Sequence, residues 1–230
     1  MYKNKTILAI VPARGDSKGI KNKNLKKIKG KTLVEHAGNV LKKISWIDYS
    51  IVSSDSNKII KSAKKSNLEC IFKRPKNISG DKIGDYTVIR HALKTFEKIK
   101  KKKIDIILLI QPTSPLRKVK HIKDVIKIII SKQLDSVWSV SKVDLKFHPF
   151  KQLIIKNKNL HYFDKKGQYI VARQQLKNTF YRNGVVYAFS RKSILKNKNL
   201  LGKRSFAYKI DTPQISIDTL KDLKLANKLI

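Results

Sequence analysis

Short apolar segments alternate with longer segments of helical periodicity along this chain, and that alternation constrains the fold more than any other feature of the sequence. The apolar segments are short and continuous, as is typical of strands buried on both faces of a sheet, and they lie at residues 6–11 (TILAIV), 49–53 (YSIVS), 69–72 (ECIF), 104–110 (IDIILLI) and 136–140 (SVWSV). Strands that alternate with helices pair in parallel, because each helix carries the chain back across the sheet. The pattern therefore predicts a mainly parallel sheet.

The segments between these strands have apolar residues at helical spacing. The clearest is 85–100, in which one stripe carries Val88, Ile89, Ala92, Leu93 and Phe96. Further helices are predicted at 33–44, 57–66, 121–131 and 219–229. With helices on both faces of the sheet, the sequence predicts a three-layer α/β fold of Rossmann-like type, in a single domain spanning 1–230.

The periodic pattern weakens between residues 145 and 178. Short polar–apolar alternations (QLIIK, LHYF and YIVA) are separated there by Asn, Lys and Gly turns, which indicates a small antiparallel insertion. Residues 184–189 (GVVYAF) then return to a core strand. We expect the insertion to extend the domain rather than to form a second one.

The formal net charge of +37 raises the hypothesis of a basic nucleic-acid-binding protein. Only eight of the 53 basic residues are arginine, however, and the lysines are spread along the chain. A nucleic-acid surface draws on arginine for bidentate and stacking contacts, and on exposed aromatic residues. The charge therefore indicates a solvated lysine surface that attracts polyanions such as nucleoside triphosphates.

The cysteine content and the hydropathy pattern bear on location. Cys70 is the only cysteine, so no internal disulfide can form, which is consistent with a reducing compartment. The apolar run near the N-terminus is too short for a signal peptide, and no segment approaches the ~20 apolar residues that span a bilayer. We expect a cytoplasmic protein without a membrane or nucleic-acid partner.

Ligands of open parallel sheets bind at the carboxyl ends of the strands. Three polar loops follow predicted strands or lie near the last helix, at 14–24, at 111–117 and around Asp218. The first loop contains two glycines, Gly15 and Gly19, which let a backbone turn tightly with its N–H groups directed at a phosphate. Its cationic residues would neutralise a triphosphate, although a generic lysine-rich surface loop is the alternative. The spacing matches neither a Walker A loop nor G-x-G-x-x-G.

The first loop, PARGDSKGIKNKN, is similar to the signature P-A-R-G-G-S-K-G-I-x-x-K-N of the CMP-sialic acid synthetase family, the acylneuraminate cytidylyltransferases. That family includes enzymes for legionaminic and pseudaminic acids. Further segments resemble the family in the same order along nearly the whole chain, namely Arg74-Pro75 with Asp81, QPTSPLR (111–117), RQQL (173–176), NGVVY (183–187) and ISIDTLKDL (215–223).

This resemblance implies a nucleotidyltransferase fold that transfers CMP from CTP to a nine-carbon sugar acid and releases pyrophosphate, with Mg²⁺ or Mn²⁺. It assigns catalytic roles to Arg14, Lys23 and Asp218, of which Asp218 would also bind the metal. The residues that it assigns to the nucleotide are Arg14, Gly15, Ser17, Lys18, Lys23, Asn24, Asp81 and Gly84. The residues that it assigns to the sugar acid are Gln111, Arg173 and Tyr187. It also implies a homodimer formed through the insertion at 145–178.

The chain departs from the family pattern at three positions. Asp16 stands where relatives have Gly, Ser216 replaces the first of two metal-binding carboxylates, and Tyr181 occupies the position of an arginine, with Arg182 beside it. Asp218 also has an alternative interpretation as the N-cap of the last helix. The sequence indicates no general base.

Two other functions are compatible with parts of the sequence. A cytidylyltransferase for the eight-carbon acid Kdo is the nearest enzymatic alternative, but the R-Q-x-L and N-G segments favour a nine-carbon acid. The basic nucleic-acid-binding protein is the non-enzymatic alternative.

Overall fold

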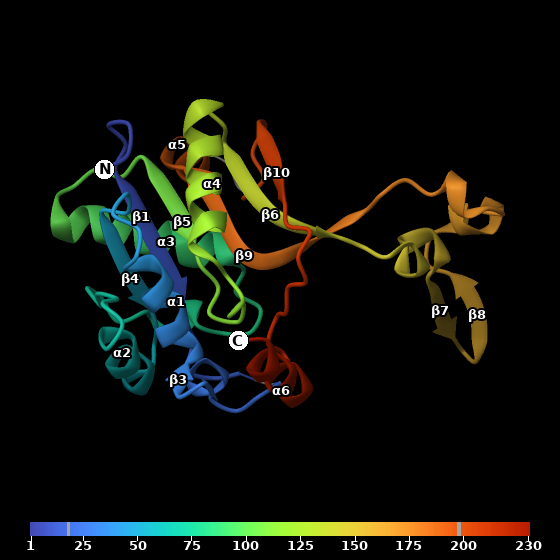
Figure 1. The fold of residues 1–230 in the computed structure, drawn as a ribbon, viewed down its shortest axis with the longest axis horizontal. Helices are drawn as coiled ribbons and strands as arrows, with labels where there is room; N and C mark the ends of the chain where they lie inside the picture. The colour runs from blue at the N-terminus through green and yellow to red at the C-terminus, as the bar shows by residue number, and fades with distance from the viewer. Residues whose placement is uncertain (18, 197–198) are drawn as a thin grey trace.

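A central sheet organises the molecule, whose computed structural model describes residues 1–17, 19–196 and 199–230 (Figure 1). Within these residues the sheet has six strands, in the order β10 (Ser205–Lys209), β6 (Ser136–Lys142), β9 (Phe180–Ser190), β5 (Ile106–Leu109), β1 (Ile7–Pro12) and β4 (Tyr49–Ser53). β1 pairs in parallel with β4 and β5, and β10 pairs in parallel with β6. β9 runs antiparallel to both of its neighbours. The prediction of a mainly parallel sheet is confirmed.

Helices cover both faces of this sheet, which confirms the three-layer α/β prediction (Figure 1). Side chains alternate along β1, so that Ile7 and Ala9 face one helical layer while Leu8 faces the other. One layer consists of α1 (Leu33–Leu41), α2 (Asn57–Lys64) and α4 (Val119–Ser131). The other consists of α3 (Asp85–Lys100) and α5 (Arg191–Lys196). None of the helices described is long and apolar enough to cross a membrane.

The ends of the sheet differ from the sequence predictions. The segment predicted as a strand at 69–72 forms a single isolated bridge, between Glu69 and Ile51 of β4, and is not a strand of the described sheet. β10 was not predicted, since this edge strand is largely exposed and lacks a continuous apolar run. The hairpin of β2 (Lys27–Ile28) and β3 (Lys31–Thr32) is too short to leave a pattern. The last helix, α6 (Leu220–Leu229), agrees with prediction.

Between β6 and β9 the chain leaves the sheet and forms a projecting arm, residues 143–179 (Figure 1). The arm contains one antiparallel hairpin, β7 (Leu153–Lys156) with β8 (Asn159–Tyr162). The third alternation, YIVA, is not a strand, and its start falls in the short 3₁₀ helix Lys165–Tyr169. The other 3₁₀ turns of the arm are Leu145–Phe147, Pro149–Lys151 and Arg173–Gln175. A further 3₁₀ turn, Lys76–Ile78, precedes α3, and another, Lys23–Leu25, ends the loop after β1.

Candidate active site

Three loops meet at the carboxyl ends of β1 and β5. The backbone N–H of Ile217, just before α6, donates to the carbonyl of Thr113 at 2.8 Å and so joins the C-terminal segment to the loop after β5. Gly19 lies so close to the same segment that an added Cβ would be 2.7 Å from the carbonyl oxygen of Asp218. Ile20 and Ile217 are buried together in a small apolar cluster. These are the three loops at which the sequence predicted a ligand site, and they form one surface.

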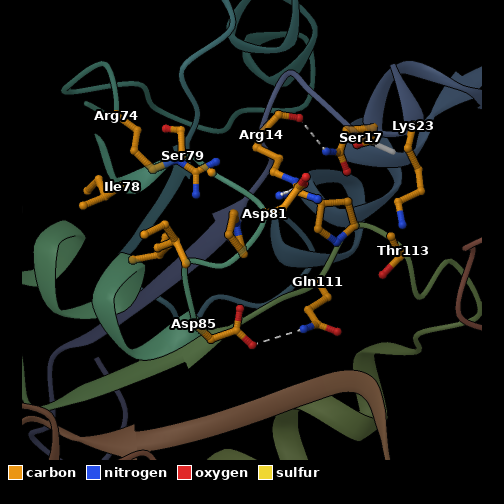
Figure 2. A pocket seen from close by; sticks show the side chains of 16 residues that line it. Arg14, Ser17, Lys23, Arg74, Ile78, Ser79, Asp81, Asp85, Gln111 and Thr113 are labelled. Atoms are coloured by element: carbon orange, nitrogen blue, oxygen red, sulfur yellow. Dashed lines mark hydrogen bonds and ion pairs between the residues drawn. The ribbon is translucent and has the colours of Figure 1, made fainter. Parts of the chain in front are cut away.

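A cavity of about 240 Å³ opens between these loops and the segment before α3 (Figure 2). Its walls come from four parts of the chain: the loop after β1, residues 74–85, the start of α3 and the loop after β5. The side chains that carry charge or a polar group on these walls include Arg14, Ser17, Lys23, Asn24, Arg74, Asp81, Asp85, Gln111 and Thr113. The cavity is therefore polar and has both cationic and anionic groups.

Arg14 extends from the end of β1 into this cavity. Its guanidinium forms an ion pair with Asp81, with 2.5 Å between Nη1 and Oδ1. Asn24 is buried, and its side-chain amide donates to the carbonyl of Arg14 at 3.0 Å. Asn24 thus holds the loop that carries Arg14, in addition to lining the cavity.

The remaining residues of this loop differ in how they relate to the cavity. Ser17 lines it, whereas Asp16 is exposed and does not. The N–H of Gly15, which we expected to face a phosphate, instead donates to Oδ1 of Asp55 at 2.8 Å, because the backbone passes close to the loop after β4. Lys18 lies outside the described residues.

Lys23 lines the cavity and is paired with Asp218 of the segment before α6, which does not line it. Lys23 Nζ lies 2.8 Å from Asp218 Oδ1, and the Asp218 side chain remains 65% exposed. The N-cap interpretation of Asp218 is wrong, because Thr219 caps α6 and forms a capping box with Asp222. The Asp218 carboxylate is thus engaged by Lys23 and solvent.

Arg74 is a cavity residue to which the sequence analysis gave no role. It is 5% exposed, and two of its guanidinium nitrogens, Nε and Nη2, have no hydrogen-bond partner. Burial lowers its pKa, the attraction of Asp55 opposes this, and the charge of Arg14 adds to the lowering. Two guanidinium groups at one cavity, one of them incompletely bonded, favour an anionic ligand.

β9 makes an irregular turn at Gly184, where its pairing with β6 shifts register between Trp138 and Val140. This turn lies against Gln111. The Gly184 backbone has φ of +74°, and a Cβ there would lie 2.6 Å from both Gln111 Oε1 and Ser114 Oγ. Beneath them the buried Arg117 guanidinium donates to the carbonyls of Gln111, at 2.5 Å, of Gly184, at 3.2 Å, and of Val185. Burial lowers the pKa of Arg117. A glycine at this point of β9 therefore lets Gln111 enter the cavity.

A wider groove of about 780 Å³ adjoins the cavity, and Asp85 and Ile83 line both. Gly84 lies in the groove rather than in the first cavity, and it is the N-cap of α3. The groove also contains Trp138 and Arg182, whose guanidinium carbon lies 5.6 Å from the centre of the Trp138 ring. It thus has an apolar wall and one strong cation.

Two residues assigned to the sugar acid lie apart from both hollows in this chain. Tyr187 is buried, and its hydroxyl accepts a hydrogen bond from the N–H of Gly184 at 2.7 Å, so that it supports the turn within β9. Burial also raises the pKa of Tyr187. Arg173 is exposed on the arm and lines neither the cavity nor the groove.

Known proteins resemble this chain over almost its full length. The sequence model of the cytidylyltransferase family matches residues 8–229. Post-translational flagellin modification protein B of Campylobacter coli is 28% identical over 97% of this chain and 94% of that protein. The N-acylneuraminate cytidylyltransferase of Streptococcus agalactiae serotype III is 27% identical over 94% of this chain, which spans only about half, 51%, of that relative.

A solved structure shares the fold. CMP:2-keto-3-deoxy-manno-octonic acid synthetase complexed with CTP superposes with a TM-score of 0.70 over 97% of this chain and 98% of that chain. At 15% sequence identity, this likeness concerns the fold alone.

Proposed function

The chain belongs to the cytidylyltransferase family, and from this premise we propose that it transfers CMP from CTP to a sialic-acid-type nine-carbon sugar acid and releases pyrophosphate. The observation that carries the proposal is the cavity at which Arg14 and Lys23 of the loop after β1 converge with Arg74 of the segment before α3. Such a set of cations suits a triphosphate. The loop that supplies Arg14 and Lys23 is the segment with the most specific family motif.

The proposed reaction is an in-line attack by the anomeric hydroxyl of the sugar acid on the α-phosphate of CTP. The new O–P bond forms as the bond to the pyrophosphate oxygen breaks. This chemistry depends mostly on positioning and on neutralising phosphate charge. Arg14 and Lys23 supply that charge, while Asn24 keeps their loop in place through the Arg14 carbonyl.

Both of these cations already have carboxylate partners. The Arg14–Asp81 pair is about one-third exposed on each side, and Asp218 of the second pair is mostly exposed. Ion pairs with this exposure are worth ~1 kcal/mol or less, so a triphosphate can compete for the cations. The carboxylates hold the cations at the cavity until the nucleotide arrives.

The adjoining groove is the proposed site of the sugar acid. Asp85 stands at the junction of the cavity and the groove, with Gln111 of the cavity wall hydrogen-bonded to it. Arg182 of the groove offers a guanidinium fork that matches a carboxylate. The apolar wall at Trp138 suits the acyl and methyl groups of such sugars. The name of the streptococcal relative, N-acylneuraminate cytidylyltransferase, supports an acid of this class.

Arg173 could reach a sugar-acid site only in a second copy of the chain, because it lines neither hollow of its own chain. It lies on the arm, whose large apolar side chains are exposed, including Ile155 at 74% and Val171 at 93%. Exposed apolar groups in such number mark an association surface. We therefore include in the proposal a homodimer in which the arm contacts the partner subunit.

The proposed dimer predicts that a charged residue introduced on the arm weakens association. The protein is expected to sediment as a dimer at micromolar concentration, and Ile155→Lys should shift it toward monomer because the lysine would be desolvated at the interface. Ile99→Lys, at a similarly apolar position that is 50% exposed on α3, is the control and should leave the dimer unchanged. A monomeric native protein would contradict the prediction.

Asp218 is the proposed ligand of Mg²⁺ or Mn²⁺. The described residues contain no group of three or more His, Cys, Asp or Glu side chains placed to hold a metal, and Ser216 replaces the first of the two carboxylates of the family pattern. One exposed carboxylate beside the phosphate cavity nevertheless fits Mg²⁺, which keeps water and substrate phosphate oxygens in its shell. When bound, the ion adds positive charge that offsets the charge of the phosphates.

The metal proposal predicts a changed magnesium requirement. Asp218→Asn should raise the Mg²⁺ concentration that gives half-maximal activity by about tenfold or more, because even outer-shell groups of a metal site contribute this much to affinity. High Mg²⁺ should then restore much of the rate. Asp211→Asn, on the same exposed segment, is the matched control. A loss of rate that no Mg²⁺ concentration restores would contradict metal binding by Asp218.

The function is tested by pyrophosphate release from CTP and Mg²⁺ with a panel of acids. We expect turnover with at least one of N-acetylneuraminic, legionaminic and pseudaminic acid. Turnover with Kdo should be much lower. Preferential turnover of Kdo would favour the eight-carbon alternative. Absence of turnover with every acid, combined with salt-dependent binding of DNA at nanomolar affinity, would favour the nucleic-acid-binding alternative.

A further inference from the structure

Asp85 occupies the junction between the phosphate cavity and the adjoining groove. It is the first residue of α3, and it is one of the two residues that line both hollows. Its carboxylate accepts a hydrogen bond from the side-chain amide of Gln111 at 3.4 Å. Figure 2 shows Asp85 and Gln111 together, apart from Arg14 and Asp81. A molecule reaching from the groove to the phosphates would pass this carboxylate.

Asp85 also differs from the other carboxylates around the site. Asp81 is paired with Arg14, and Asp218 is paired with Lys23. Among the described residues that line the cavity, Asp85 is the carboxylate that has no basic nitrogen within 4 Å, and no histidine lines the cavity. It is therefore the lining group best able to accept a proton.

We propose that Asp85 is the general base that accepts the proton of the anomeric hydroxyl, a role that rests on the function proposed above. As the hydroxyl oxygen forms its bond to the α-phosphorus, the O–H bond breaks and the proton passes to an Asp85 carboxylate oxygen. The bond between the α-phosphorus and the bridging oxygen breaks at the same time. Pyrophosphate leaves with that electron pair, so the step needs no further reactant.

The surroundings of Asp85 suit this role. Burial raises the pKa of its carboxyl group, while Arg182 of β9 and the Gln111 hydrogen bond oppose the rise. Tyr187 of β9 interacts electrostatically with Asp85 and with the buried Arg117, and the other charged groups that line the cavity with Asp85 are Arg14, Lys23, Arg74 and Asp81. The N-terminus of α3 favours the ionised form. A raised pKa makes the ionised carboxylate a stronger base.

The test compares native protein with Asp85→Asn, which keeps the shape of the side chain and removes the base. With the best acid of the panel, kcat should fall about 100-fold or more, and KM for CTP and for the acid should change less than about threefold. Asp85→Glu should recover part of the rate. In the native protein kcat should rise tenfold per pH unit below the pKa of Asp85, since only the ionised carboxylate accepts a proton, and this acidic limb should be absent in Asp85→Asn.

Other outcomes overturn the inference in distinguishable ways. If Asp85→Asn raises KM for the acid but keeps kcat and the acidic limb, Asp85 binds the sugar and is not the base. If native kcat has no acidic limb, the inference fails without reference to any variant. If the native protein binds CTP but turns over none of the acids, the proposed function fails and the inference fails with it. Native turnover with unchanged kcat in Asp85→Asn overturns the inference alone.

Discussion

Arg14→Ala is expected to lower the rate of pyrophosphate release by about 10²- to 10³-fold, the effect of removing one preorganised charge from a site that stabilises a transition state. The Arg14 guanidinium lines the phosphate cavity, and its loop is held by Asn24. No other described residue of the loop after β1 besides Lys23 brings a positive charge to this cavity. The loss should appear in kcat as well as in KM, because charge on the phosphates increases as pyrophosphate leaves.

The control for this substitution is Arg90→Ala, which removes an exposed arginine of α3 that does not line the cavity. Both variants should retain the fold, since the Arg14–Asp81 pair is partly exposed and contributes ~1 kcal/mol or less to stability. Thermal melting checks this point before the rates are compared. Near-normal turnover of a folded Arg14→Ala protein would contradict the role of this loop.

Gly184→Ala is expected to damage both stability and activity. The positive φ of Gly184 costs a non-glycine residue about 1–2 kcal/mol, and a Cβ at 2.6 Å from Gln111 and Ser114 adds an overpacking cost of about 1–3 kcal/mol. Gln111 must move to relieve the contact. Displacement of a substrate-positioning group by about 1 Å costs roughly 10²-fold in rate, so kcat/KM should fall by that order.

Gly30→Ala separates the cost of positive φ from the cost of the steric contact with Gln111 and Ser114. Gly30 has a similar φ of +77°, but an added Cβ there would meet no atom within 4 Å. In urea unfolding, Gly30→Ala should therefore lower the free energy of unfolding by about 1–2 kcal/mol, the cost of positive φ alone. Its activity should be unchanged. If Gly184→Ala behaves like Gly30→Ala in both urea unfolding and turnover, then the turn within β9 does not position Gln111.

The fold was predictable because its central strands are continuous apolar runs. The segments 6–11, 104–110 and 136–140 correspond to the inner strands β1, β5 and β6, and 49–53 corresponds to the edge strand β4, whose last three residues are buried. Burial on both faces is what makes such runs continuous, so they are easy to recognise. β10 lies at the edge, where exposed side chains remove that signal. The antiparallel direction of β9 follows from the path of the arm and not from its own residues.

Most of the predicted residues that line the candidate cavity belong to a continuous motif of the sequence, and Asp81 is an exception. Arg14, Lys23 and Asn24 stand in one loop, whereas Arg74 enters from a segment that hydrogen-bonds through its backbone to Ser54 at 2.8 Å. That long-range contact leaves no local pattern. Asp85 in sequence resembles any acidic residue in a first helical turn, and its contact with Gln111 depends on the tertiary fold.

The use of backbone groups was the least predictable feature. A glycine beside a cationic residue suggested a free N–H for a phosphate, but the N–H of Gly15 is bonded to Asp55. Similarly, Tyr187 matches a sugar-binding position by resemblance, while its hydroxyl accepts from Gly184. Hydrogen-bond partners far apart in sequence decide such cases.

The location of bound CTP tests the central claim most directly. In a crystal structure with CTP and Mg²⁺, the triphosphate is expected in the cavity between the loop after β1 and Arg74, with Arg14 and Lys23 turned from their carboxylate partners toward phosphate oxygens. A nucleotide bound elsewhere, with both ion pairs intact and the cavity filled only by water, would contradict the account.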